Sequence, residues 1–215
     1  MKIIDELLYI SEEECALCKY EVADINGICH DCNKRLDYVD MSYFDEADVK
    51  INYTLFLNNF LSGIIDRFKF KGQAYLYKSL GKIMYDRAKS SGILDGIDFI
   101  IPVPMHRRAE NIRGFNQSEL LSKRISELSG IPYDTEVVVK IKNTPPQHLL
   151  TSSERMKNLI GSFKLKNLNL SGKRILIVDD ILTTGATVKH LTDEIKKSKP
   201  KTIEIMALTS GRRID

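Results

Sequence analysis

The stretch ILIVDDILTTGATV, residues 175–188, decides which fold we expect for this chain. Its first four residues are aliphatic without polar alternation, which is typical of a strand covered on both faces in a parallel sheet. Two carboxylates, Asp179 and Asp180, follow the strand, and a helical pattern begins near Val188. Because ligands of such sheets bind beyond the carboxyl ends of the strands, the stretch predicts an α/β domain with a ligand site at these carboxylates.

Between the carboxylates and the helix lies a loop that is suited to an anion. Its small side chains, hydroxyls and glycine let several backbone N–H groups converge on one phosphate, and the helix directs its positive end to the same point. The residues expected to bind phosphate are Thr183, Thr184, Gly185, Ala186 and Thr187. An ordinary strand-to-helix turn, with Asp180 capping the helix, would explain the same pattern without a ligand.

The two carboxylates need a partner other than the phosphate, because they repel it by roughly 4 kcal/mol at about 4 Å in an effective dielectric of about 20. A sugar diol donates two hydrogen bonds to carboxylates, and a ribose whose C1 becomes cationic gains further from their charge. Asp179 and Asp180 are therefore candidate catalytic residues that bind a ribose phosphate. In this stretch the sequence resembles the type I phosphoribosyltransferases, which bind phosphoribosyl pyrophosphate (PRPP).

All four cysteines lie near the N-terminus in two C-x-x-C pairs, which are Cys15, Cys18, Cys29 and Cys32. Two such pairs can place four thiolates tetrahedrally around one Zn²⁺ ion, with Asn26 and Gly27 forming the turn between them. A site closed by four protein ligands is structural, so we expect zinc to stabilise a ribbon-like segment. Disulfides or a redox motif are the alternative, which a cytoplasmic location disfavours.

Charge and composition divide the 215-residue chain into three predicted parts. Residues 1–50 form an acidic zinc-ribbon-like segment with 13 Asp and Glu against 5 Lys and Arg, residues 51–97 a helical linker or hood, and residues 98–215 the phosphoribosyltransferase-like core. The basic remainder favours polyanions such as PRPP or nucleic acid, although a solvated surface explains it equally. No apolar stretch is long enough to cross a membrane, so we expect a cytoplasmic protein without membrane insertion.

Residues 53–70 carry apolar side chains at helical spacing, and residues 75–89 form a second predicted helix. The first helix ends in a run where bases alternate with aromatic rings, which includes Arg67, Lys69, Phe70 and Lys71. Such a run can stack on single-stranded nucleic acid and neutralise it. It is also typical of an amphipathic helix end with phenylalanine inside and lysine outside, so both interpretations stay open.

The predicted core has further strands at residues 99–104, 135–141, 163–168 and 201–208, and a helix at residues 119–129. Together they indicate a parallel central sheet flanked by helices. Arginines that follow the first strand suit pyrophosphate, because a guanidinium stays charged and binds bidentately. The polar, proline-containing segment 143–162 is typical of an active-site lid, with Gln147 and Arg155 as its candidate residues.

Several short runs, taken together, resemble the ComF family of late competence proteins over nearly the whole chain. They are the paired cysteines, KFKG at residues 69–72, PVPMHRR at 102–108, RGFNQSELL at 113–121, TPPQ at 144–147 with Arg155 and Asn158 downstream, and VDDILTTGAT at 178–187. One departure is Lys142, at a position where the family often has arginine. A lysine keeps the charge there but loses the bidentate fork.

This resemblance implies a zinc ribbon, a type I phosphoribosyltransferase core and a role in natural transformation, where single-stranded DNA arrives on the cytosolic side of the uptake machinery. It implies that Asp179 and Asp180 contact ribose hydroxyls and that the threonine loop holds the 5-phosphate. The segment that it implies for pyrophosphate contains Pro104, Met105, His106, Arg107 and Arg113. The implied partners are PRPP, single-stranded DNA and the helicase and other proteins of DNA uptake.

We therefore expect an enzyme that displaces pyrophosphate from PRPP with a nitrogen nucleophile, while Mg²⁺ bridges pyrophosphate and ribose oxygens and the lid excludes water. The alternative is a non-catalytic PRPP-binding adaptor that binds single-stranded DNA in the same machinery. Substrate and effector pockets need the same phosphate chemistry, so the sequence leaves both functions open.

Overall fold

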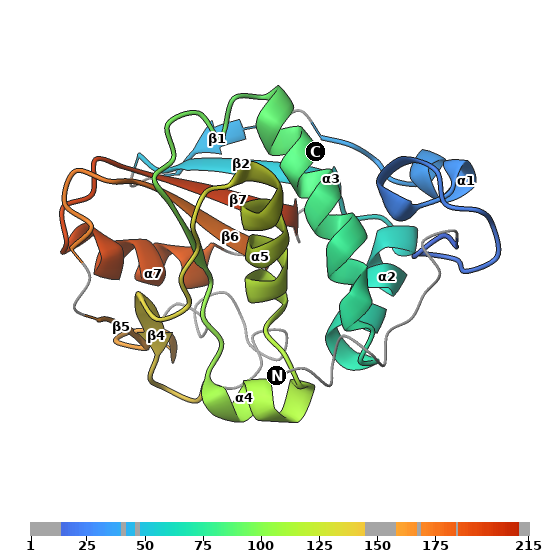
Figure 1. The fold of residues 1–215 in the computed structure, drawn as a ribbon. Helices are drawn as coiled ribbons and strands as arrows, with labels where there is room; N and C mark the ends of the chain where they lie inside the picture. The colour runs from blue at the N-terminus through green and yellow to red at the C-terminus, as the bar shows by residue number, and fades with distance from the viewer. Residues whose placement is uncertain are drawn as a thin grey trace.

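A mixed five-stranded sheet organises the chain in the computed structural model, which describes residues 14–39, 42–45, 48–144, 158–166, 169–183 and 185–210 (Figure 1). The strand order is β1-β2-β7-β6-β3. β1 pairs antiparallel with β2, and the other neighbours are parallel. The carboxyl ends of these four parallel strands therefore meet at one edge. The strands are β1 (Ser42–Phe44), β2 (Lys50–Phe56), β3 (Phe99–Pro102), β6 (Arg174–Leu182) and β7 (Thr202–Ser210).

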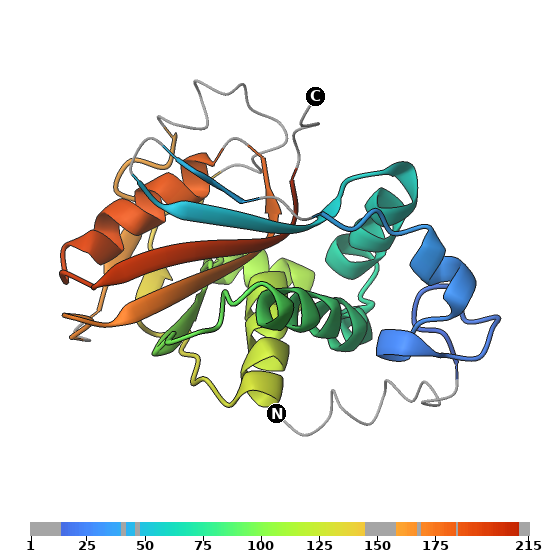
Figure 2. The same ribbon diagram turned by 90° about the horizontal axis from the view of Figure 1, so that it is seen from above.

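Helices cover both faces of the sheet, as the sequence predicts (Figure 2). α3 (Tyr77–Ser90) and α5 (Gln117–Ser129) pack on one face, and α7 (Ala186–Lys196) packs on the other. In β6, Leu176 and Val178 belong to the first apolar cluster and Ile175 and Ile177 to the second. A strand that is apolar at successive positions thus buries side chains on both sides, which is why it lacks polar alternation.

The predicted helix at residues 53–70 is wrong in its first four residues, which belong to β2. α2 (Asn59–Phe70) begins after Asn58, whose side chain accepts a hydrogen bond from Leu61 N at 2.8 Å. The side chains of Asn52 and Thr54 in β2 each donate a hydrogen bond to a backbone carbonyl of β7. Polar side chains at alternate positions of β2 therefore help to hold the two strands together. The strand that opens segment 51–97 therefore belongs to the same sheet as the core.

Two of the other predicted strands lie outside the main sheet. β4 (Val138–Lys140) and β5 (Phe163–Leu165) form an antiparallel pair of their own. The pair lies against α7, where Leu165 N donates to Glu194 Oε1 at 3.1 Å. No sequence pattern predicts α4 (Arg107–Arg113), a short helix between β3 and α5.

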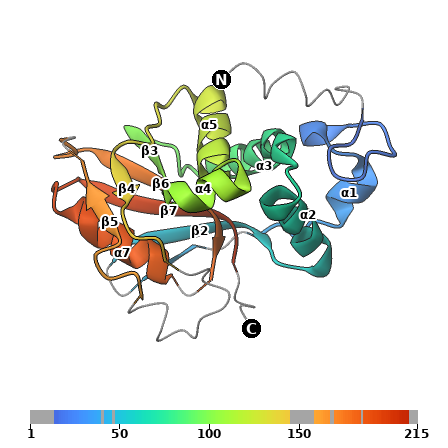
Figure 3. The ribbon, with the colours of Figure 1, turned by 90° about the horizontal axis from the view of Figure 1, so that it is seen from below.

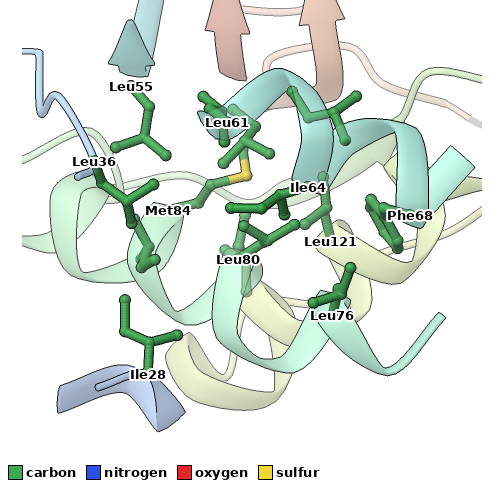
Figure 4. Close-up of a cluster of buried hydrophobic side chains, with 14 of the residues drawn as sticks. Ile28, Leu36, Leu55, Leu61, Ile64, Phe68, Leu76, Leu80, Met84 and Leu121 are labelled. Atoms are coloured by element: carbon green, nitrogen blue, oxygen red, sulfur yellow. The ribbon is translucent and has the colours of Figure 1, made fainter. Parts of the chain in front are cut away.

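The cysteine-containing segment packs directly against the helices that follow it (Figure 4). It contains the short helices η1 (Ile25–Gly27) and α1 (His30–Lys34), while η2 (Ala74–Leu76) leads into α3. Ile28 and Leu36 from this segment share one buried cluster with Ile64 of α2 and Leu80 and Met84 of α3. None of the helices in the described ranges is both long and apolar enough to cross a bilayer.

Candidate functional site

The site is built around Asp179 and Asp180 in the carboxyl-terminal half of β6. Both residues are buried, at 7% and 8% exposure. Asp179 Oδ1 accepts hydrogen bonds from Ser118 Oγ at 2.8 Å and from Asp180 N at 2.9 Å. Asp180 Oδ1 accepts one from Ile181 N at 2.6 Å. The strand therefore presents two adjacent carboxylates with fixed orientations at the edge where ligands of such sheets bind.

Three cations surround these carboxylates. Lys69 Nζ, at the end of α2, lies 2.9 Å from Asp180 Oδ2. Arg113, the last residue of α4, is half-buried, and burial lowers its pKa while the charge of Asp180 opposes that shift. Burial likewise lowers the pKa of Lys140 in β4, and Asp179 opposes it. The site thus collects basic side chains from three separate segments around the acidic pair.

Asp179 ionises less readily than an ordinary aspartate. Burial, with the adjacent charge of Asp180, raises the pKa of Asp179 to about 7, although Ser118 and Lys69 act in the opposite direction. Asp180 has an ammonium group within ion-pair distance. Near neutral pH Asp179 can therefore hold or release a proton beside the ion pair that Asp180 forms with Lys69.

A small hollow lies beside Asp179 at the start of α7. Thr183, Gly185, Ala186 and Thr187 line it, while Thr184 lies outside the described residues. Gly185 is the N-cap of α7 with φ of 74°, a left-handed conformation that glycine adopts without strain. The first turn of α7 also lines the hollow, so the helix directs its positive end there, as an anion requires.

The residues expected around pyrophosphate are distributed along α4 and the segment before it (Figure 3). Pro104 and Met105 are half-buried, and His106 caps α4, its Nδ1 accepting from Arg108 N at 3.2 Å. Arg107 is exposed at the start of α4, while Arg113 lies at its other end. Of these two arginines, Arg113 is the one that the charge of Asp180 reaches.

The remaining predictions in this region concern the lid. Gln147 and Arg155 lie outside the described residues. Lys142, which replaces the arginine common in the resembled family, is exposed and donates from Nζ to Ile160 O at 2.7 Å.

The basic and aromatic run at the end of α2 has two different surroundings. Arg67 Nη2 donates to Leu17 O at 2.7 Å, and Lys69 pairs with Asp180. These two residues point to the cysteine segment and to the acidic pair instead of a shared nucleic-acid surface. Phe70 is 63% exposed with Arg113 at 5.2 Å from its ring, and Lys71 is exposed. Only the second half of the run is available to a macromolecule.

The four cysteines form the candidate metal centre. Their sulfur atoms all lie within 4.8 Å of one another, and all four are free thiols, so the disulfide alternative is absent at these positions. Cys18 Sγ and Cys29 Sγ are 3.8 Å apart. Tetrahedral Zn²⁺ with bonds of about 2.3 Å requires sulfurs about 3.8 Å apart, so the spacing fits zinc. The exposed His30 is not a member of the cluster.

Local geometry explains how the cysteines come together. Asn26 and Gly27, with φ of 61° and 72°, form the left-handed turn expected between the pairs. Burial would raise the pKa of Cys15, but hydrogen bonds from the backbone at Cys29 and Cys18 lower it to about 7. A thiol that ionises near neutral pH is prepared to bind a metal, since the thiolate is the ligand.

Sequence reasoning missed Ser118, Gln117 and Lys140 as residues of the site, and it named Lys69 only as a nucleic-acid contact. Ser118 hydrogen-bonds Asp179, Gln117 links Arg113 Nη1 at 2.9 Å to Phe68 O at 3.3 Å, and Lys69 and Lys140 supply charge. Ser118 and Gln117 lie in the RGFNQSELL run and Lys69 in KFKG, so the motifs marked their positions. The side-chain directions that bring these motifs to β6 depend on helix packing, which a motif does not reveal.

Comparison with known proteins agrees with this geometry. Residues 116–213 match the family described as "Phosphoribosyl transferase domain". The chain is 33% identical over 154 residues to competence protein F of Haemophilus influenzae, covering 69% of this chain and 67% of that protein. It is 31% identical over 151 residues to DNA utilization protein YhgH of Shigella flexneri, covering 69% and 66%.

Two further similarities extend over more of the chain. Competence protein ComFC of Bacillus subtilis is 25% identical over 204 residues, which cover 95% of this chain and 80% of that protein. A solved adenine phosphoribosyltransferase of Saccharomyces cerevisiae aligns over 84% of this chain and 86% of its own, with a TM-score of 0.46 and 14% identity. The chain belongs to the ComF family of competence proteins, with a type I phosphoribosyltransferase core behind a four-cysteine N-terminal segment.

Proposed function

We propose that this protein binds PRPP and catalyses the displacement of pyrophosphate from C1 of the ribose by a nitrogen nucleophile. The observation that carries the proposal is the buried Asp179–Asp180 pair next to a hollow at the N-terminus of α7. Acidic acceptors beside an anion-binding helix end suit a molecule with both a diol and a phosphate. PRPP has both, together with a leaving group that basic side chains would bind.

Each part of the substrate has candidate residues. Thr183 to Thr187 would hold the 5-phosphate, and Asp179 and Asp180 would accept hydrogen bonds from the ribose hydroxyls. Arg113 would bind pyrophosphate, with Pro104 to Arg107 forming the wall on that side. As the bond between C1 and pyrophosphate breaks, positive charge develops on the ribose, and the nearby carboxylates stabilise it.

Mg²⁺ fits this site by its donor set. The carboxylates of Asp179 and Asp180 are hard oxygen ligands, which this ion prefers together with substrate phosphates. When bound, Mg²⁺ would neutralise part of the charge on pyrophosphate. The candidate lid residues Gln147 and Arg155 would exclude water from the reacting ribose, as we infer from the composition of their segment.

The relatives named for competence and DNA utilization suggest where this chemistry is used. We place the protein in the cytoplasm, handling single-stranded DNA together with the helicase and other uptake proteins. A second candidate function follows from the exposed Phe70 and Lys71, which could stack on and neutralise a DNA strand. In that case PRPP would be an effector of a DNA-binding adaptor.

The decisive experiment incubates the zinc-loaded protein with Mg²⁺, PRPP and one candidate acceptor at a time, namely ammonia, nucleobases or oligonucleotides, and follows release of pyrophosphate. Asp180→Asn tests the acidic pair, and Asp86→Asn, an acid on α3 that pairs with Lys82, is the matched control. Turnover that is lost only in Asp180→Asn supports the enzyme. PRPP binding without turnover, together with oligonucleotide binding that Phe70→Ala weakens, supports the adaptor.

A further inference from the structure

Lys69 brings an ammonium group into the sugar site from outside the core. Its Nζ lies 2.9 Å from Asp180 Oδ2, and its side chain is only 17% exposed. Asp180 is its single polar partner among the residues that the structure describes. An ammonium group has three N–H donors, so the Asp180 contact leaves donors for a ligand.

The end of α2 is held in place on two sides, and this fixes Lys69. Arg67 donates to Leu17 O in the cysteine segment, and Gln117 donates to Phe68 O from the start of α5. The ring of Phe68 is completely buried and lies 5.7 Å from that of Phe115. A long, flexible side chain attached to so rigid a turn loses less freedom when it binds a ligand, which favours a functional contact.

Charge in the site points to an anion. Two carboxylates face three cations, Lys69, Arg113 and Lys140, and Asp179 is the acid whose ionisation burial suppresses. Half-buried cations in excess of their acidic partners are costly unless an anion binds between them. The hollow at α7 accounts for one phosphate, but Lys69 contacts the acid pair through Asp180, the member that does not line this hollow.

We propose that Lys69 is a further pyrophosphate-binding residue, donating to a pyrophosphate oxygen while it keeps its contact with Asp180. This inference rests on the proposed function. In PRPP the pyrophosphate on C1 and the ribose hydroxyls lie on the same face of the ring, so a cation that touches the carboxylate binding those hydroxyls lies next to the leaving group. When the C1–O bond breaks, its electron pair stays on pyrophosphate, and Lys69 stabilises the added charge. The acceptor nitrogen bonds to C1 and releases its proton to solvent water.

The test measures binding of three ligands by calorimetry in Mg²⁺: PRPP, pyrophosphate and ribose 5-phosphate. Lys69→Met should weaken PRPP and pyrophosphate by about 10- to 100-fold, the usual effect of losing a charge-assisted hydrogen bond. Ribose 5-phosphate, which lacks the leaving group, should change by less than about 3-fold. Lys69→Arg should keep part of the affinity, and the control Lys78→Met, at an exposed position of α3, should change none of the three.

Two results would overturn the assignment. If Lys69→Met weakens the binding of all three ligands equally, Lys69 only positions Asp180. If Lys69→Met binds PRPP more tightly than the unmodified protein, the ammonium group of Lys69 occupies a position that a cation bound to PRPP would take. Thermal unfolding of each variant checks that the fold is kept, and Lys69→Gln replaces Lys69→Met if the latter unfolds. Failure of the proposed function looks different, because the unmodified protein would then bind none of the three ligands.

Discussion

Asp179→Asn removes a residue of the proposed active site, yet its free energy of unfolding relative to that of the unmodified chain should increase as the pH rises. Burial, with the charge of Asp180, raises the pKa of Asp179 from 3.8 to about 7. Between these two values the folded chain keeps a proton that the unfolded chain has released. The stability linked to this proton is fully present below the unfolded value and is lost as the pH rises through the folded value.

The size of the effect follows from the two pKa values. Between about pH 5 and about pH 8, a carboxyl with these values lowers the free energy of unfolding by about 2 to 3 kcal/mol. Asparagine does not ionise, and its Oδ1 can accept the same hydrogen bonds from Ser118 Oγ and Asp180 N. The stability of Asp179→Asn relative to the unmodified chain should therefore increase by this amount over the range.

Urea unfolding at several pH values, followed by circular dichroism with zinc at a fixed concentration, measures this difference. Both proteins share the pH dependence of the cysteines, so it cancels. Asp98→Asn is the control of opposite sign, because a hydrogen bond from Arg174 N lowers the pKa of Asp98 and its stabilising effect is lost on acidification. A stability difference for Asp179→Asn that stays constant with pH would refute the reasoning.

Three other substitutions test packing, the loop and the metal centre. Gly81→Ala places a Cβ 2.6 Å from Arg124 Cβ between α3 and α5. The free energy of unfolding in urea should therefore fall by about 1 to 3 kcal/mol. A more stable variant, as helix propensity alone predicts, would contradict this contact. In Gly185→Ala the alanine must adopt φ of 74°, so the free energy of unfolding should fall by about 1 to 2 kcal/mol. Calorimetry should also show weaker PRPP binding. Unchanged stability would argue against the left-handed conformation of this N-cap. Elemental analysis should find about one zinc per chain in the unmodified protein and less in Cys18→Ser, and full metal retention in Cys18→Ser would exclude a four-thiolate site.

The sequence predicted the parts of the fold whose information is local. The aliphatic run of β6, the glycine before α7 and the two cysteine pairs each require particular residue types in a fixed order, and the structure has them as expected. Residues 53–56 are predicted as helix although they belong to β2, because their apolar side chains adjoin the stripe of α2. The strand conformation of β2 depends on pairing with β7, about 150 residues later in the chain, and no local pattern records that partner.

The same distinction applies to the site. Asp179, Asp180 and the threonine loop follow one another in sequence, so their proximity could be inferred. Lys69 was interpreted as an outward-facing helix end or a nucleic-acid contact, since helical spacing places lysines outside apolar stripes. Its contact with Asp180 arises because the first turns of α5 and the cysteine segment hold the end of α2 beside β6. Such a meeting of four segments is a property of tertiary packing alone.

The shared apolar cluster of the cysteine segment and the helices has a practical consequence for anyone who shortens this chain. Ile28 and Leu36 cover Ile64, Leu80 and Met84. A fragment that starts at β2 would therefore expose an apolar surface and should aggregate during expression. Chelating a metal held by the four cysteines should also disturb the acidic pair. Arg67, which donates a hydrogen bond to Leu17 O in the cysteine segment, lies in the same helical turn as Lys69, which contacts Asp180. The four-cysteine segment thus supports the end of α2 that positions Lys69 beside the acidic pair, and its removal should disturb that position.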